Sequence, residues 1–195
     1  MTSVRLVVSK PVLQFAVLVL ASLWLALAQA AEPVGKVLFA VRGVEIVRVQ
    51  GVAEPAKKGT LLYQGDKVVT GEKGRAQIQF VDGARTALRP GSELVIEQYE
   101  VETASQDGEL VVASGGSAVL GLLKGGMRAV SGSITKENPE GMSVKTPVAT
   151  MGIRGTDFTA ALVPAGRGKF VLNVAVRDGV VRIFNGLGSI DVNAG

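Results

Sequence analysis

The chain has 195 residues, with 21 basic and 17 acidic side chains and a formal net charge of +4. It contains no cysteine and no histidine, which excludes disulfide bonds and the side chain that most often serves as a general base or zinc ligand. A fold of this length must therefore be stabilised by apolar burial and backbone pairing.

The first 30 residues are predicted to be a secretory signal peptide. Arg5 and Lys10 precede an apolar run over residues 15–28, and Ala28-Gln29-Ala30 fits a small-x-small cleavage site. The run is shorter than the roughly 20 residues that a membrane-spanning helix needs, although an uncleaved anchor remains the alternative. Cleavage would leave residues 31–195 as the mature chain.

Removal of this segment leaves 19 basic and 17 acidic residues, a net charge of only +2. An exported chain of such low charge is not expected to bind nucleic acid. We therefore predict a periplasmic or otherwise extracytoplasmic location, with membrane contact only if the N-terminal segment is not cleaved. The oligomeric state stays open.

Short strands are predicted in the first part of the exported chain. Apolar runs at residues 37–41 and 44–49 flank Arg42-Gly43, which indicates two strands joined by a tight turn or a bulge. Apolar and polar side chains alternate over residues 75–81, as in a strand with one buried face. Asp82-Gly83 then predicts a hairpin, because both central residues of a type I′ turn need positive φ.

The middle and the end of the chain continue this pattern. Residues 93–101 are apolar on both faces in parts, which indicates a strand between two layers. Residues 102–117 are polar and rich in Gly and Ser, so they are predicted to be an insertion with its own hairpin. Asp178-Gly179 is predicted to close a further hairpin between residues 169–177 and 180–184.

These features together predict an all-β fold. No segment after the signal peptide shows a sustained 3.6-residue apolar period, and the chain holds 25 glycines. Turn signals recur every 8–12 residues, which is typical of a sandwich or barrel of short strands. We expect residues 31–195 to form one domain of short strands and hairpins, preceded by the signal helix.

Residues 146–158 carry the densest positional constraints. Pro147 fixes its own φ and holds Thr146 extended. Gly152 and Gly155 flank Ile153-Arg154, which predicts a tight crossing between two strands with the arginine held in it. The alternation from Thr156 onward indicates the second strand.

This stretch resembles the signature of the FecR-type domain, in which Thr-Pro is followed by a hydrophobic-Arg-Gly-Thr and an aromatic residue. Gly65-Asp66-Lys67-Val68-Val69-Thr70 and the segment 75–94 are similar to two further motifs of that family, in the same order. The resemblance spans about residues 35–195. The signature positions, with a structural or partner-binding role, are Gly65, Asp66, Thr70, Thr146, Pro147, Gly152, Arg154, Gly155, Thr156 and Phe158.

The resemblance implies a β-sandwich with solenoid-like stacking and a non-catalytic extracytoplasmic role in protein binding or signalling. In the family, such domains pass information from outer-membrane receptors to cytoplasmic sigma factors. Only nine residues precede Lys10, so no cytoplasmic anti-sigma segment is expected here. The expected partner is a protein of the cell envelope. The alternative is a structural or cell-wall-associated β protein that binds glycan or peptidoglycan.

Arg154 is the strongest single candidate for a residue that binds a partner. Its guanidinium could offer two parallel hydrogen bonds to a carboxylate or phosphate of a partner. The favoured interpretation is structural, with Arg154 folding back onto a carboxylate of the domain and satisfying nearby carbonyls. Asp66 and Asp157 are the obvious acids.

No enzyme, metal or cofactor is expected. Ser143 and Lys145 share a strand face but lack a recognisable oxyanion hole. The acidic cluster is interpreted as a solvated strand edge, and it comprises Glu93, Glu97, Glu100 and Glu102. Four aspartates adjoin glycine without calcium-loop spacing, namely Asp66, Asp82, Asp107 and Asp178.

Overall fold

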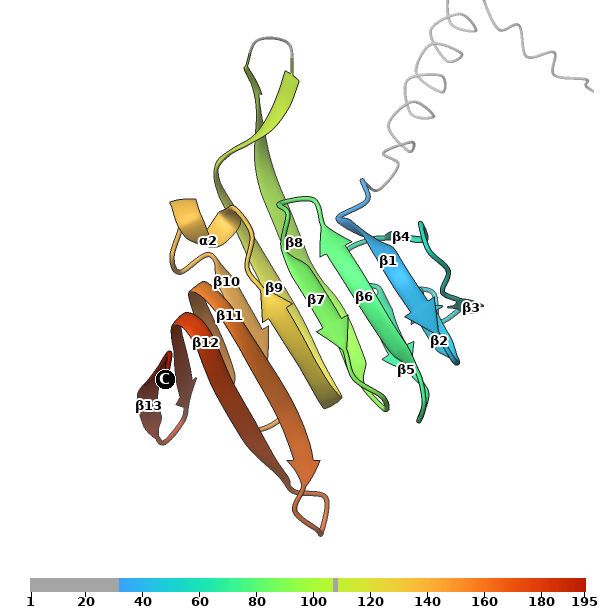
Figure 1. The fold of residues 1–195 in the computed structure, drawn as a ribbon, viewed down its shortest axis with the longest axis vertical. Helices are drawn as coiled ribbons and strands as arrows, with labels where there is room; N and C mark the ends of the chain where they lie inside the picture. Colours follow the sequence, from blue (N-terminus) through green and yellow to red (C-terminus); the bar gives the residue numbers. More distant parts are fainter. Residues whose placement is uncertain (1–31, 107–108) are drawn as a thin grey trace, which may run out of the picture. The chain divides into compact units, whose positions relative to one another are not determined.

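The computed structural model describes residues 32–106 and 109–195. The predicted signal peptide lies outside these residues. Nearly all of the regular structure in the described part of the chain is strand, which confirms the all-β class (Figure 1). The elements are β1 (Gly35–Val41), β2 (Val44–Val47), β3 (Ala53–Pro55), β4 (Leu61–Leu62), β5 (Lys67–Thr70), β6 (Arg75–Phe80), β7 (Arg85–Leu88), β8 (Glu93–Gln106), β9 (Glu109–Val130), α2 (Ile134–Glu137), β10 (Met142–Lys145), β11 (Thr150–Pro164), β12 (Phe170–Asn185) and β13 (Gly188–Asn193).

All the strands belong to one hydrogen-bonded sheet. Its main path runs β13-β12-β11-β10-β9-β7-β6-β1-β4, and a branch continues from β9 through β8, β5 and β2 to β3. The pairings are antiparallel except that of β9 with β10, which is parallel from Met142 opposite Ala118 to Lys145 opposite Gly121. The sheet is therefore mixed. Pro33–Gly195 form one compact unit.

β9 belongs to both the main path and the branch of the sheet. Its residues 116–124 pair with β8, whereas residues 125–130 pair with β7 and β11. Between them Gly125 has a φ of +75°. A Cβ there would lie 2.6 Å from the carbonyl oxygen of Gly91, so this bend requires glycine. Ser92 fixes the bend, since its Oγ accepts from Gly126 N at 2.9 Å and donates to Gly126 O at 2.9 Å.

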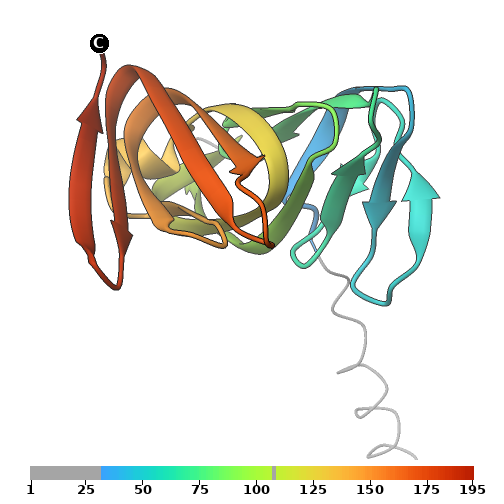
Figure 2. The same cartoon turned by 90° about the horizontal axis from the view of Figure 1, so that it is seen from below.

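Because of this bend the sheet folds over on itself and encloses a single apolar core (Figure 2). Val37 and Ile78 pack into the core from strands of the main path, and Ile46 and Ile96 pack into it from strands of the branch. Phe158 is among the largest side chains that are completely buried. The strands thus supply the two opposed apolar faces that the sandwich prediction requires.

The alternation predicted for residues 75–81 is confirmed, since Ala76, Ile78 and Phe80 are buried and Gln77 and Gln79 are not. The prediction that residues 93–101 lie between two layers is wrong. One face of β8 is buried, through Leu94, Ile96 and Tyr99, and the other is open to solvent in part. Its apolar outward residue Val95 is half-buried.

Two of the predicted turns were placed correctly. Asp82-Gly83 joins β6 to β7, although only Gly83 has a positive φ, of +85°, so the turn is not type I′. At Arg42-Gly43 both residues have positive φ, at +59° and +76°. This turn carries the chain from β1 into β2, and these strands pair with different neighbours rather than with each other.

Of two further predicted hairpins, the one within residues 102–117 is present and the one at Asp178-Gly179 is not. In the polar segment 102–117 the ends of β8 and β9 form this hairpin, with pairs from Thr103 opposite Val112 to Gln106 opposite Glu109. The prediction of a hairpin at Asp178-Gly179 is wrong, because β12 runs unbroken from Phe170 to Asn185.

Within the described ranges, no helix has the length and apolar character needed to cross a membrane.

Candidate functional site

The Gly65-Asp66 motif forms a buried polar turn. Asp66 is buried, and its Oδ2 accepts a hydrogen bond from the Tyr63 backbone N at 2.8 Å and one from Arg48 Nη1 at 2.5 Å. Arg48 also pairs with Glu54 and lies 5.5 Å above the Tyr63 ring centroid. Gly65 has a φ of +89°. The motif therefore holds the turn before β5 against β2 instead of presenting groups to solvent.

Thr70 has a similar internal role at the end of β5. Its side chain is buried, and its Oγ1 donates to Arg89 O at 2.7 Å and accepts from Ser92 N at 2.8 Å. These bonds attach β5 to the turn that precedes β8. A hydroxyl is suited to this position because it both donates and accepts.

Thr146-Pro147 closes the tight turn between β10 and β11. The backbone N of Thr146 donates to Ala149 O at 3.0 Å, and its Oγ1 donates to the same oxygen at 2.7 Å. That Oγ1 also accepts from the backbone N of Ala149 at 3.1 Å. The turn is thus closed by a threonine side chain that mimics backbone pairing.

The predicted tight crossing at Gly155 is a β-bulge within one continuous strand. β11 and β12 pair as Arg154 opposite Val180 and Asp157 opposite Asp178, with a register shift between these pairs. Gly155 has a φ of +64°, and Gly179 on β12 has a φ of +81°. Residues 155–156 of β11 thus face the single residue 179 of β12, at the level where β11 changes its partner from β10 to β9.

Buried side chains next to the bulge fix its position. Thr156 and Phe158 are buried, and the Thr156 backbone N donates to Ser131 Oγ at 2.9 Å. Thr156 Oγ1 has no hydrogen-bond partner among the described residues. Gly152, in contrast, has no close neighbour: a Cβ there would lie 3.8 Å from Arg182 O, an ordinary contact. Space alone therefore does not require glycine at that position.

Arg154 does not contact either of the acids expected from the sequence. Its Nη2 donates to Glu140 Oε1 at 2.8 Å, in a pair whose side chains are 35% and 79% exposed. Asp66 is paired with Arg48, and Asp157 with Arg128. Arg154 therefore pairs with a carboxylate of the domain, as expected, but that carboxylate is Glu140 and not Asp66 or Asp157.

Replacing Arg154 with alanine should change the free energy of unfolding by less than about 1 kcal/mol, because an exposed ion pair gains little over its hydrated partners. Replacement of a buried, paired arginine would lower the free energy of unfolding by more than this. The measurement is a urea unfolding curve of Arg154→Ala beside Glu140→Gln and the unmodified protein. A loss several times larger than that of Glu140→Gln would contradict the exposed geometry.

A second buried polar cluster lies at the β6–β7 turn. Tyr99 Oη donates to Asp82 Oδ1 at 2.6 Å, and the Tyr99 ring stacks on Phe80 with centroids 4.5 Å apart. Asp82 Oδ1 also accepts from Ala84 N at 3.0 Å, whereas Oδ2 has no partner among the described residues. Burial, with a contribution from Asp82, raises the pKa of the Tyr99 phenol well above its ordinary value.

Above about pH 10 the stabilisation that this cluster contributes should decrease. The ordinary pKa of tyrosine is 10.0, so the unfolded chain releases the Tyr99 proton there while the folded chain retains it. The stabilisation is complete below that pH and falls by roughly 1.4 kcal/mol per unit above it. Urea midpoints measured from pH 8 to 11 should fall more steeply for the unmodified protein than for Tyr99→Phe. Parallel curves would contradict the prediction.

Three of the residues considered for catalysis are engaged in ion pairs, namely Lys145, Glu97 and Glu93. Lys145 Nζ donates to Glu97 Oε2 at 2.7 Å, which leaves Ser143 without its expected partner. Glu93 lies 3.6 Å from Lys67. Among the described residues no three acidic side chains come together in an arrangement that could hold a metal ion.

A pair of adjoining hollows lies on the outward face of β6, β7, β9, β11 and β12. The larger, of about 450 Å³, is lined by Arg75 and Arg89, and the smaller, of about 340 Å³, by Asp157 and Arg177. Arg128 lines both. We call this surface the arginine groove and define it by Arg75, Arg89, Arg128 and Arg177.

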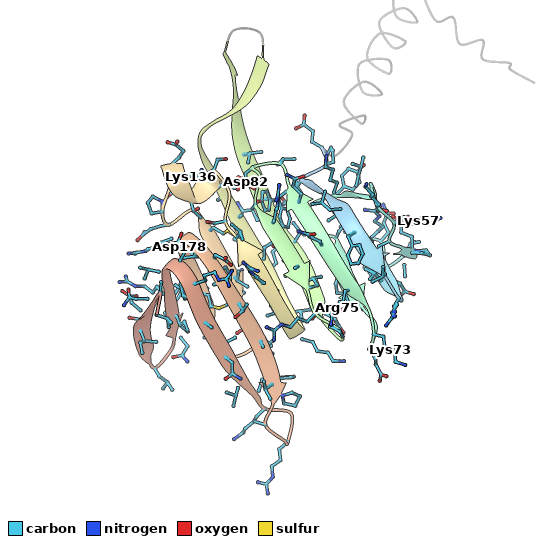
Figure 3. The ribbon with its side chains drawn as sticks, in the orientation of Figure 1. Lys57, Lys73, Arg75, Asp82, Lys136 and Asp178 are labelled. Carbon is cyan, nitrogen blue, oxygen red and sulfur yellow. The ribbon has the colours of Figure 1, made fainter. Side chains whose placement is uncertain are left out.

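Side chains from distant parts of the sequence meet in the arginine groove through cross-strand register. The row Gln77, Ala87, Arg128, Thr159 and Ala175 crosses five neighbouring strands. Arg75 stands at the end of β6 opposite to the Asp82 turn (Figure 3). None of the groove arginines had been singled out from the sequence, and the only early signal was the polar alternation in residues 75–81.

The comparison with known families identifies the chain. The family model described as FecR protein matches residues 66–182. The chain belongs to the FecR family. The matched part of this FecR domain begins at the buried Asp66, includes the bulge at Gly155 and ends in β12. It leaves β1–β4 and β13 outside.

Two crystal structures of a "putative anti-sigma factor" from Parabacteroides distasonis, at 1.65 and 2.50 Å resolution, are similar to the FecR domain. Each is 16% identical, with a TM-score of 0.46, and the match covers 66% of this chain and 51% of that one. The chain therefore spans about half the length of that protein. No curated protein matches the chain significantly.

Proposed function

We propose that this FecR domain is a non-catalytic extracytoplasmic module that takes part in signalling by binding a protein partner. The observation that carries the proposal is the family match over residues 66–182. The polar side chains of its signature support it, because Asp66, Thr70 and Thr146 form hydrogen bonds within the fold. Function would then depend on contact through the exposed surface.

An extracytoplasmic location is supported by the sequence of residues 1–30, with its basic start, apolar run and small-x-small site. The test is N-terminal sequencing of the protein recovered from the cell envelope. A mature chain beginning at Ala31 is expected, whereas an N-terminus at Met1 would indicate an anchor that is not removed. Recovery of the full chain in the cytoplasmic fraction would contradict the proposed location.

Protein binding can be tested by photo-cross-linking in intact cells. A photoreactive amino acid is placed at Gln77 in the arginine groove and, in separate strains, at Glu45 and Glu100 on other surfaces, all three being at least partly exposed. A discrete protein adduct from at least one position, identified by mass spectrometry, is the expected result. The absence of a protein adduct from all three positions would contradict a protein-binding role.

The alternative of a cell-wall-associated protein is favoured by one observation, the excess of cations in the arginine groove, since these would also attract acidic groups of a glycan. It predicts co-sedimentation with purified peptidoglycan sacculi. Under the leading proposal the protein stays in the supernatant, with the same distribution for a variant in which the groove arginines are replaced by glutamine.

A further inference from the structure

The arginine groove concentrates positive charge on a nearly neutral protein. Residues 33–195 hold 19 basic and 16 acidic side chains, yet the groove has four arginines and a single acidic side chain, Asp157. Arg128 donates to this carboxylate at 2.9 and 2.7 Å. That hydrogen bonding, with the charge of Arg177 nearby, holds the pKa of Asp157 below its usual value.

The remaining arginines of the groove are available to a ligand. Within the described residues, Arg75, Arg89 and Arg177 take part in no ion pair and are exposed. Arg89 lies across the backbone of Gly126, where a Cβ would come within 3.3 Å of its Cδ. The same Cβ would lie 3.0 Å from Ala160 O, so the glycine leaves room for both the neighbouring strand and the Arg89 side chain.

We propose that the arginine groove binds an extended acidic segment of a protein partner, with glutamate or aspartate side chains paired to Arg75, Arg89 and Arg177. This inference deepens the proposed protein-binding function and rests on it. It assigns to the partner a stated chemistry, that of carboxylates spaced along an unfolded or loop segment.

The type of cation favours carboxylates on a peptide. Every basic side chain that lines the groove is an arginine, and none is a lysine. The planar guanidinium binds a carboxylate through two parallel hydrogen bonds, which a lysine ammonium cannot do. Arginine is also enriched and lysine depleted in the interfaces between proteins.

The shape of the groove fits a peptide that crosses the strands. Its floor includes the small side chains of Ala87, Thr159 and Ala175, and Phe39, which is 47% exposed, offers an apolar contact at one end. From Phe39 to Ala175 the row crosses six strands, a distance of about 24 Å at the usual strand spacing, which matches about seven extended residues. β6, β7, β9 and β11 are paired on both sides, so the segment binds through side chains rather than as an added strand.

The test uses the protein purified after expression of the full chain. The probe is a fluorescein-labelled peptide of twelve residues in which glutamate and serine alternate, and its control has glutamine in place of glutamate. Fluorescence anisotropy should show saturable binding of the glutamate peptide alone, weakened by raising the salt concentration because the contacts are ionic. The variant Arg75→Gln/Arg89→Gln/Arg177→Gln should bind at least about tenfold more weakly.

A matched control removes the same charge elsewhere. Lys57, Lys58 and Lys136 are exposed and lie outside the groove, so Lys57→Gln/Lys58→Gln/Lys136→Gln should bind within about twofold of the unmodified protein. Circular dichroism verifies that both variants are folded. Equal losses in the two triple variants would reduce the effect to general electrostatic attraction and overturn the proposal.

Two further probes distinguish other classes of anionic ligand. Vesicles containing phosphatidylglycerol and the polyanionic glycan polygalacturonate are titrated under the same conditions. Tighter binding of either one than of the glutamate peptide would overturn the proposal. Cross-links from Glu45 or Glu100 but none from Gln77, with no effect of the groove variant on them, would leave the proposed protein binding intact and reject the arginine groove as its site.

Discussion

Replacing Gly179 with alanine is expected to lower the free energy of unfolding by about 3 kcal/mol or more. Gly179 has a φ of +81°, a conformation that costs a residue with a Cβ roughly 1–2 kcal/mol. The added Cβ would also overlap the carbonyl oxygen of Gly155 and lie 2.8 Å from Thr156 Cγ2. Both neighbours belong to the bulge of β11, so relief of the overlap would separate two paired strands, at a further cost of roughly 1–3 kcal/mol.

Two alanine variants separate the causes of this loss. Gly155 has a φ of +64° but open space around its Cβ position, so Gly155→Ala should show the backbone strain alone, about 1 kcal/mol. Gly186 has neither a positive φ nor a close neighbour, and Gly186→Ala should be neutral within about 0.5 kcal/mol. Urea unfolding should show the largest loss of stability for Gly179→Ala, a smaller loss for Gly155→Ala and the smallest for Gly186→Ala. Equal losses at Gly179 and Gly155 would show that the close approach of the strands is not maintained in solution.

The same position shows why the sequence prediction of Asp178-Gly179 as a hairpin turn was wrong. A glycine with positive φ serves a tight turn and a β-bulge equally well. Which of the two forms depends on the partner strand, and the partner here is β11 with its own glycine at 155. That pairing is set by tertiary register and leaves no local signal in residues 169–184.

What could be predicted was the part of the fold governed by local periodicity and turn chemistry. The alternating pattern of residues 75–81 gave the correct buried face, and Asp82-Gly83 gave the correct position of a turn. The bend of β9 at Gly125 could not be predicted, because it follows from the close approach of Gly91 and Ser92 in the folded chain. The fold-over of the sheet depends on that contact.

The site shows the same division. The signature motifs were located from the sequence, but the partner of Arg154 was not, since Asp66 and Asp157 are engaged by arginines 18 and 29 residues away along the chain. The arginine groove was missed entirely. Its four arginines come from β6, the end of β7, β9 and β12, and each appears in the sequence as an ordinary exposed position. Only the cross-strand register brings them together.

The second large effect is expected at Asp66. Asp66→Ala should cost about 3 kcal/mol, because it leaves the backbone N–H of Tyr63 without its side-chain acceptor and removes the buried carboxylate that Arg48 contacts at 2.5 Å. Arg48 would retain Glu54, which is 44% exposed, and the carbonyl of Leu61, but it would lose its one buried carboxylate partner. The turn before β5 would then lose the bonds that hold it against β2.

Glu54→Ala is the matched control, since it removes a carboxylate from the same arginine. Glu54 is 44% exposed, and solvent replaces most of what an exposed partner provides, so the loss should stay below about 1 kcal/mol. Asp66→Asn should lie between the two, because the amide oxygen can still accept from Tyr63 N while the charge is gone. The measurement is the urea midpoint, compared between variants whose free energy of unfolding has the same dependence on urea concentration. If Asp66→Ala and Glu54→Ala gave the same loss, the burial of the Asp66 carboxylate would contribute nothing, and this part of the signature would be available for a role on the surface.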